Sequence, residues 1–224
     1  MLNILFLLVA GLIGYICGAL PFGFLYVKLT KKVDLREIGS GRTGGTNSLR
    51  AAGVGVGVLT GLSDVLKGFA GVWLSRLLLS GAVGEGWLPW VLVTAGVMAV
   101  VGHNWSVFIN WCGGAGTGPN IGWATALWWP MFPIGLIVMI ALLLVVGMAS
   151  VASLAMAAII PISFAILYFT GEPGYSETLA YLIGGLASAA IVTWALRPNI
   201  KRLLNGTERV VGPRAKRMAK RQQQ

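Results

Sequence analysis

Long apolar runs dominate the chain, and the polar positions gather in a few short segments between them. Residues 2–27, 51–80, 87–108 and 179–196 each form one apolar stretch, and residues 121–169 are almost wholly apolar. A helix crosses the hydrocarbon core of a bilayer with about 20 apolar residues. The four separate stretches therefore each predict one transmembrane helix, and the long region predicts at least two crossings.

Two of these stretches contain irregular positions. Gly14 and Gly18 in the first have the spacing at which two helices approach closely. Pro21 is expected to kink the first helix or to end its regular part. The second stretch carries Asp64 and Lys67, which share a helical face because they lie three residues apart. Its length allows one tilted helix, or a short re-entrant helix followed by a span.

The polar segments are rich in glycine and predict loops. Residues 34–50 and 110–120 are expected to be irregular. Inside the long apolar region, Pro130, Pro133 and Gly147 are the expected breaks between helices.

Composition supports a membrane protein and argues against a nucleic-acid-binding one. Only 11% of the 224 residues are charged, and mean hydropathy is +0.80. A soluble domain carries about 25% charged residues. The net charge of +10 is spread unevenly, since residues 86–171 contain no Asp, Glu, Lys or Arg. Lipid must therefore solvate much of the surface, and the middle of the chain offers nothing to nucleic acid.

The positions of the cations predict the orientation of the chain in the membrane. They cluster at residues 28–50 and 197–221, and cationic segments beside spans face the cytoplasm. The N-terminus is then outside and the C-terminus cytoplasmic, which requires an odd number of crossings, with five and seven both open. We expect an all-α polytopic membrane domain over residues 1–210 and a basic, disordered tail at 211–224. Nothing in the pattern indicates an oligomeric state.

Two polar blocks near the first spans could bind an anion. Residues 39–50 combine glycines, which expose backbone N–H groups, with Ser40, Asn47, Arg42 and Arg50. The forked arginine side chains suit phosphate, and this combination beside a span favours a binding loop over a flexible connection.

A second candidate is the pair of ionisable residues inside the second apolar stretch. Ionisable groups there are costly and usually face an interior cavity. Lys67 could reach a phosphate while Asp64 keeps it charged, or the two could form a structural ion pair between helices.

Two further blocks lie after the third and the last apolar stretch. His103 is the only histidine and falls at the end of a span, where it could exchange a proton or act as an interfacial anchor. The glycine run at residues 113–118 predicts a backbone cradle for an anion. Residues 197–208 place Asn199 and Glu208 among cations, in a segment that could also be an amphipathic interfacial helix.

These four blocks, in this order, resemble the acyl-phosphate-dependent glycerol-3-phosphate acyltransferases of bacterial membranes. That family has Gly-Ser-Gly-Asn-Pro-Gly-Ala-Thr-Asn at the position of residues 39–47, and Asp-x-x-Lys-Gly at the position of residues 64–68. Its Gly-His and Gly-Gly-Lys-Gly blocks correspond to residues 102–103 and 113–116. Its tail, Asn-Ile-x-Arg-Leu-x-x-Gly-Thr-Glu, is matched by residues 199–208, the most specific block.

The resemblance implies a seven-helix protein of the inner (plasma) membrane with its motif loops on the cytoplasmic side. It implies acyl transfer from a fatty acyl phosphate to the 1-hydroxyl of glycerol 3-phosphate, giving lysophosphatidate for phospholipid synthesis, with no metal or other cofactor. The candidate catalytic residues are His103, Asn199 and Lys67. The candidate substrate-binding residues are Ser40, Gly41, Arg42, Asn47, Arg50, Gly113, Gly114, Gly116, Ser150, Ser153, Arg202 and Glu208.

The implied chemistry is coherent because an acyl phosphate already carries a good leaving group. Position and charge then matter more than a covalent nucleophile. The acceptor's own phosphate could serve as the base, with His103 orienting it or relaying the proton. The residue five places after His103 is Phe108, so the chain lacks the His-x-x-x-x-Asp arrangement of another acyltransferase class.

The chain departs from the family pattern at a few positions. Ala115 stands where the family has a lysine, and Arg42 and Thr43 replace Asn-Pro, so Arg42 is a candidate to supply the missing charge. Residues 117–120 also differ from the segment that begins a helix in the family. Two alternatives follow: a catalytically silent relative that binds lipid or phosphate, and a small lipid or solute transporter built on Gly- and Pro-broken helices.

Overall fold

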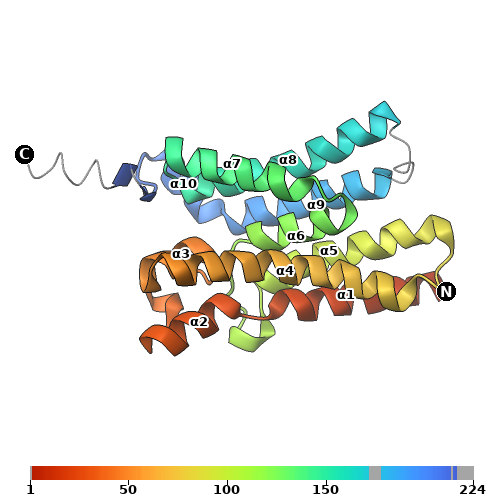
Figure 1. The fold of residues 1–224 in the computed structure, drawn as a ribbon, viewed down its shortest axis with the longest axis horizontal. Coiled ribbons are helices and arrows are strands. Elements are labelled where there is room, and N and C mark those ends of the chain that lie inside the picture. Colours follow the sequence, from red (N-terminus) through yellow and green to blue (C-terminus); the bar gives the residue numbers. More distant parts are fainter. Residues whose placement is uncertain (1, 172–177, 213, 216–224) are drawn as a thin grey trace, which may run out of the picture.

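The computed structural model describes residues 2–171, 178–212 and 214–215, and this part of the chain is helical without any strand (Figure 1). The α-helices are α1 (Leu2–Ala19), α2 (Phe22–Lys31), α3 (Gly45–Ala52), α4 (Val54–Leu79), α5 (Leu88–Asn104), α6 (Thr117–Leu127), α7 (Met131–Val145), α8 (Ala149–Thr170), α9 (Thr178–Ala195) and α10 (Arg197–Leu204). Three short 3-10 helices are η1 (Leu35–Glu37), η2 (Glu85–Trp87) and η3 (Val107–Ile109). The all-α prediction is confirmed, whereas most of the predicted tail, residues 213 and 216–224, lies outside the described residues.

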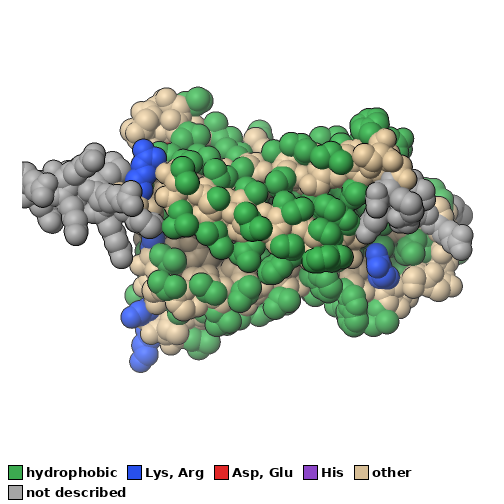
Figure 2. Space-filling view, turned by 45° about the horizontal axis from the view of Figure 1, so that its top comes forward, with side chains coloured by type: hydrophobic (Ala, Val, Ile, Leu, Met, Phe, Trp, Pro, Cys, Tyr) green, Lys and Arg blue, Asp and Glu red, His purple; other side chains and the backbone are tan. Residues whose placement is uncertain are grey.

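Several helices are long and apolar enough to cross a membrane. Four such segments are Leu2–Lys31, Val54–Leu79, Leu88–Ile109 and Ala149–Thr170, and a fifth is obtained when α9 is joined to α10 across a bend of 64°. Hydrophobic side chains cover much of the lateral surface in view, and the Lys and Arg side chains visible on this face lie toward the two ends of the bundle (Figure 2). This distribution is that of an integral membrane protein.

The first span is broken at Pro21, and glycine allows its first half to pack tightly. A Cβ at Gly14 or Gly18 would collide with the carbonyl oxygens of Ala95 and Ala99 on α5, so the predicted close approach of helices is confirmed. Pro21 separates α1 from α2 and frees carbonyls at the break. The Leu20 carbonyl there accepts hydrogen bonds from the Phe22 N–H at 3.1 Å and from a side chain of α4 described below, since lipid offers it no donor.

The second apolar stretch, residues 51–80, is almost entirely one helix, α4, as the first of the two alternatives has it. Gly53, with φ 90°, ends α3 and begins α4. The prediction that residues 34–50 are an irregular loop was wrong in part, because η1 lies within them and α3 begins at Gly45. Helix α3 folds back onto α4, where a Cβ at Gly57 would meet Leu49. This contact explains why an outwardly polar segment is helical.

Helices α6 and α7 form a hairpin inside the long apolar region. The loop expected at residues 110–120 ends early, because Gly116 takes a left-handed conformation (φ 85°) and α6 begins at Thr117. Pro119 lies in the first turn, where its missing N–H is not needed. The expected break at Pro130 is confirmed and so is that at Gly147, but Pro133 lies inside the first turn of α7.

The arrangement gathers the polar blocks at one end of the bundle. Leu2 begins α1 at the opposite end from α10, and α2, α3 and α10 lie together (Figure 1). Thr43 N–H donates to the Gly113 carbonyl at 3.4 Å, which joins two of the predicted blocks. The apolar core lies between α5, α6, α8 and α9, centred on the fully buried Trp123 and Phe164, whose ring centroids are 5.7 Å apart.

Candidate active site

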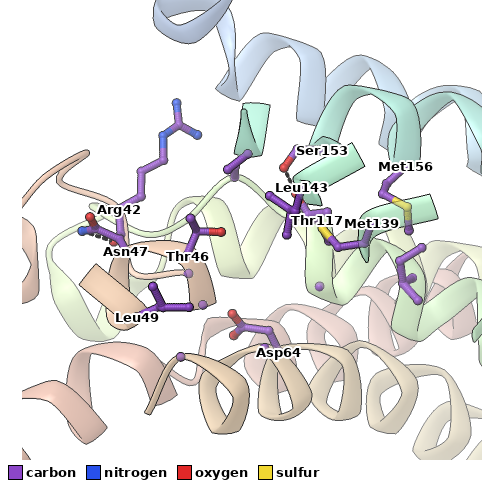
Figure 3. A pocket seen from close by; sticks show the side chains of 18 of the residues that line it. Arg42, Thr46, Asn47, Leu49, Asp64, Thr117, Met139, Leu143, Ser153 and Met156 are labelled. Atoms are coloured by element: carbon purple, nitrogen blue, oxygen red, sulfur yellow. Dashed lines mark hydrogen bonds between the residues drawn. The ribbon is translucent and has the colours of Figure 1, made fainter. Parts of the chain in front are cut away.

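One pocket of about 410 Å³ joins the polar end of the bundle to an apolar groove. Its walls come from the loop before α3 and from α3, α4, α5, α6, α7, α8 and α10. Figure 3 shows Arg42 and Thr46 on one side, Thr117 and Ser153 opposite them, and Asp64 between the two sides. The pocket therefore has a polar end and an apolar end within a single cavity.

Asn47 shapes the polar loop instead of facing a ligand with free groups. Its side-chain nitrogen donates to the carbonyls of Ile38 at 2.8 Å, Arg42 at 2.9 Å and Leu35 at 3.2 Å. Its oxygen accepts from the Ser40 N–H at 3.1 Å. Asn47 lines the pocket, but these bonds use its amide, so its part is to hold the loop that presents Ser40 and Arg42.

Arg42 and Arg50 bring positive charge to the pocket wall. Burial lowers the pKa of Arg42, and the neighbouring Arg202 acts in the same direction. Burial also lowers the pKa of Arg50, with Arg209 as the next cause. Arginine remains protonated at neutral pH despite such shifts, so both side chains lower the cost of bringing an anion into the pocket.

Asp64 stands at the centre of a buried cluster. Its Oδ1 lies 2.9 Å from Lys67 Nζ and 3.5 Å from His103 Nδ1, and all three side chains are about 5% exposed or less. Lys67 Nζ also donates to the Leu20 carbonyl at 2.8 Å. Asp64 and His103 line the pocket, whereas Lys67 does not. Lys67 therefore has the geometry of the structural ion pair, not that of a ligand for phosphate.

The glycine run after α5 supports His103 and is not a free anion cradle. Gly113 N–H donates to the Asn104 carbonyl at 3.1 Å, and Gly114 N–H donates to the His103 carbonyl at 3.0 Å. Those N–H groups are used, so the predicted backbone cradle was wrong at these two positions. A Cβ at Gly114 would collide with His103 Nε2, which means that glycine is required for the imidazole to fit.

The block at α10 forms its own network around Glu208. Asn199 Nδ2 donates to Glu208 Oε1 at 2.9 Å, and Arg202 Nε donates to Glu208 Oε2 at 3.1 Å. Asn199 Oδ1 is buried and has no hydrogen-bond partner within the described part of the chain. Asn199 lines the pocket, so Glu208 fixes the amide with its oxygen available as an acceptor.

Hydroxyl groups mark the boundary between the polar and apolar parts of the pocket. Thr117 Oγ1 donates to Ser153 Oγ at 2.8 Å (Figure 3). Ser150 Oγ is buried and has no partner among the residues that the structure describes. Thr117 and Ser150 lie in the first turns of α6 and α8, where helix dipoles and free N–H groups favour negative charge.

Beyond this boundary the lining is apolar and reaches the outside of the bundle. Met139, Leu143 and Met156 line it in Figure 3. Val58 and Leu62, which also line it, are 54% and 47% exposed on the lateral surface. The groove therefore opens sideways, between α4 and α7, where lipid chains would lie.

The structure brings together most, but not all, of the predicted site residues. Those that line the pocket are Ser40, Arg42, Asn47, Arg50, His103, Ser150, Ser153, Asn199 and Glu208. Those that do not line it are Gly41, Lys67, Gly113, Gly114, Gly116 and Arg202. Sequence reasoning missed Thr117 and the apolar wall, because no spacing within one helix indicates which of many leucines and methionines faces a groove. Within the described ranges, no group of three or more His, Cys, Asp or Glu side chains is placed to hold a metal ion.

Comparisons with known proteins agree on one family. The family model described as "Glycerol-3-phosphate acyltransferase" matches residues 8–206. A protein of that name from Rubrobacter xylanophilus is 39% identical over 208 residues, which is 91% of this chain and 94% of the relative. Another from Gloeobacter violaceus is 37% identical over 198 residues, which is 88% of this chain and 91% of the relative.

Two solved structures have a similar fold. A crystal structure of PlsY, an integral membrane glycerol 3-phosphate acyltransferase in its glycerol 3-phosphate form, superposes with a TM-score of 0.76 at 30% identity, covering 92% of this chain and 96% of that one. The lysophosphatidic acid form gives a TM-score of 0.74 at 29% identity, covering 92% and 95%. The whole helical bundle, and not one motif, is therefore shared.

Proposed function

Because the chain belongs to the glycerol-3-phosphate acyltransferase family, we propose that its pocket binds glycerol 3-phosphate at the polar end and a fatty acyl phosphate in the apolar groove. The protein is a membrane acyltransferase that makes lysophosphatidic acid, a step in phospholipid synthesis. The proposal concerns the identity of the acyl donor and the roles of the pocket residues in binding and transfer. The family assignment favours an enzyme over the transporter alternative.

The observation that carries the proposal is that one cavity has a positively charged, polar end continuous with an apolar end. Two arginines, an amide and several hydroxyls line one end, and the other end opens sideways toward lipid. A phosphorylated polyol needs the first environment, since its phosphate is recognised by cations and N–H groups. A long acyl chain needs the second, since each buried CH₂ contributes about 0.8 kcal/mol. Both substrates therefore meet where Thr117, Ser150 and Ser153 lie.

The reaction is a direct transfer. The 1-hydroxyl of glycerol 3-phosphate attacks the carbonyl carbon of the acyl phosphate and forms the ester C–O bond. The carbonyl carbon's bond to the phosphate oxygen breaks, and inorganic phosphate leaves with that electron pair. Because the leaving group is good, holding the two substrates in line supplies most of the catalysis.

The hydroxyl proton must go to a base, and two groups are suitable. One is the phosphate of the acceptor itself. The other is His103, whose Nδ1 faces Asp64 Oδ1 at 3.5 Å. A carboxylate only accepts hydrogen bonds when ionised, so Asp64 favours the proton on Nδ1 and leaves Nε2 as the acceptor. Asn199 Oδ1, fixed by Glu208, can orient glycerol 3-phosphate by accepting a hydrogen bond from its other hydroxyl, which leaves the proton of the 1-hydroxyl for the base.

The proposed placement in the membrane puts the polar end at the cytoplasmic face of the inner membrane. Lys28, Lys31 and Lys32 at the end of α2 support it, because cations beside spans stay in the cytoplasm. With α1, α4, α5, α8 and α9 as full crossings, the N-terminus is outside. Helix α6 has 11 residues and spans about 16 Å, roughly half the hydrocarbon core. The number of crossings is therefore five if the α6–α7 hairpin is not counted as two spans, and seven if it is. Residues 1–210 form one domain in this proposal, followed by the basic tail.

A reconstituted assay tests the proposal. The purified protein in lipid vesicles is given glycerol 3-phosphate with a fatty acyl phosphate or with an acyl thioester, and lysophosphatidate and released phosphate are measured. We expect lysophosphatidate and phosphate in equal amounts when the donor is acyl phosphate, and no lysophosphatidate when the donor is the acyl thioester. Asn199→Asp should reduce turnover strongly, whereas Asn205→Asp, in an exposed position at the end of the same helix, should not. Absence of product from folded protein would support the silent-relative alternative, and product from the thioester alone would remove the proposed donor.

A further inference from the structure

Arg42 has one half of its guanidinium group held in place and the other half free. Its Nη2 donates to the carbonyl of Ala195, the last residue of α9. Its Nη1 is buried and has no hydrogen-bond partner among residues 2–171, 178–212 and 214–215. A buried cationic donor without an acceptor is costly, and Arg42 lines the pocket. Arg42 therefore brings an unsatisfied cationic donor to the wall of the pocket.

Within the described part of the chain, no carboxylate forms an ion pair with Arg42. Glu208 is the acidic group that acts on it, but both Glu208 oxygens already accept hydrogen bonds, from Asn199 and Arg202. The other carboxylate in the pocket wall, Asp64, is 2.9 Å from Lys67 Nζ. The polar end thus carries a surplus of positive charge, and an anion is the ligand that it would take up.

The fixed half of Arg42 connects this charge to Asn199. Ala195 ends α9, Leu196 is the N-cap of α10, and Asn199 lies in the first turn of α10. The two helices meet at a bend of 64°. A ligand that binds Nη1 therefore contacts the same side chain whose Nη2 is hydrogen-bonded to the helix end at this bend.

We propose that Arg42 is the main phosphate-binding residue of this pocket and that its bond to Ala195 couples phosphate binding to the position of Asn199. The inference rests on the proposed function and adds which cationic side chain binds the phosphate. Arg50 also lines the pocket, and Ala115, on the wall near His103, contributes no charge. The phosphate could belong to glycerol 3-phosphate or to the acyl phosphate, and the kinetics distinguish the two.

The chain offers a closely matched control in Arg197. Its Nη1 donates to the Trp194 carbonyl at 3.0 Å, one residue before the carbonyl that Arg42 uses. It does not line the pocket. Arg197→Ala therefore removes an arginine–carbonyl bond at the same helix end without removing a pocket cation, and it should leave both KM values unchanged.

The test compares Arg42→Ala and Arg42→Lys with Arg197→Ala. Arg42→Ala should raise the KM for one phosphate-bearing substrate by about 10- to 100-fold, the range of a charge-assisted hydrogen bond. Arg42→Lys keeps the charge but loses the fork, and should fall between Arg42→Ala and wild type. Adding Ala115→Lys to Arg42→Ala should recover part of the loss, because position 115 faces the same pocket. A raised KM for glycerol 3-phosphate assigns the acceptor, and a raised KM for acyl phosphate assigns the donor.

A second readout does not depend on turnover. Inorganic phosphate should raise the thermal midpoint of the wild type and of Arg197→Ala, but not that of Arg42→Ala. If Arg42→Ala does not fold, Arg42→Gln replaces it, since glutamine keeps a donor for the Ala195 carbonyl without the charge. The inference is overturned if the Arg42 variant keeps both KM values and the full phosphate effect. If the wild type makes no lysophosphatidate but phosphate raises its thermal midpoint and not that of Arg42→Ala, the proposed function is contradicted and the phosphate-binding role of Arg42 is not.

Discussion

Replacing Lys67 by Met should destabilise the fold much more than it changes substrate binding. Lys67 Nζ is 2.9 Å from Asp64 Oδ1 and 2.8 Å from the Leu20 carbonyl, in a site where both charged side chains are about 5% exposed. Removing one member of a buried ion pair costs about 3–5 kcal/mol, because the other charge is left uncompensated. The Leu20 carbonyl keeps its hydrogen bond from the Phe22 N–H at 3.1 Å, so the unpaired Asp64 charge is the main cost.

The double variant tests whether the unpaired charge is the main cost. In Lys67→Met with Asp64→Asn no bare charge is left, so this protein should recover a large part of the loss. The measurement is the free energy of unfolding in mixed detergent micelles for the wild type, the single variant and the double variant. A loss below about 1 kcal/mol for Lys67→Met would contradict the reasoning, because that is the size expected of an exposed pair.

The same variant also tests the sequence-based prediction that Lys67 belongs to the catalytic group. Lys67 does not line the pocket, so the KM for glycerol 3-phosphate should stay unchanged in the folded fraction. The rate can fall, since Asp64 also faces His103. If Lys67→Met folds normally and raises this KM, the lysine contacts the substrate after all.

Three other changes have distinct expected results. Gly18→Leu should prevent folding, because even a Cβ there collides with the α5 backbone, whereas Gly61→Ala meets open space and should be neutral; size-exclusion profiles and thermal midpoints compare them. Ser150→Ala should leave stability unchanged and raise the KM of a substrate about fivefold, since it deletes a buried hydroxyl that has no partner in the described structure and is free for a ligand. The Arg36 side chain holds the pKa of Asp34 below its usual range. A carboxylate whose pKa is lower in the folded protein stabilises the fold at pH values above the unfolded pKa of about 4. This stabilisation is lost as the pH falls through the folded pKa. The thermal midpoints of wild type and Asp34→Asn should therefore differ at pH 7 and converge in acid.

The linear pattern alone determined the broad architecture of this protein. Uncharged runs of spanning length predict membrane helices whatever their partners are, because an apolar helix is stable in lipid on its own. Local chemistry also predicted the breaks at Pro21 and Gly147 and the close packing at Gly14 and Gly18, all of which the fold contains. Three of the four polar blocks lie at one end of the bundle, and Asp64, in the middle of α4, lines the same pocket.

Only the tertiary structure decided how each polar group is used. Whether Lys67 meets a phosphate or a carbonyl depends on where the α1–α2 break falls beside α4. The N–H groups of Gly113 and Gly114 look free in the sequence, but α5 supplies carbonyls that take them. Helix α3 and the first turn of α6 contain glycine and polar residues that favour loops locally, and packing against α4 outweighs that preference. Hydrogen-bond partners distant in the chain are chosen by packing, and no local spacing encodes that choice.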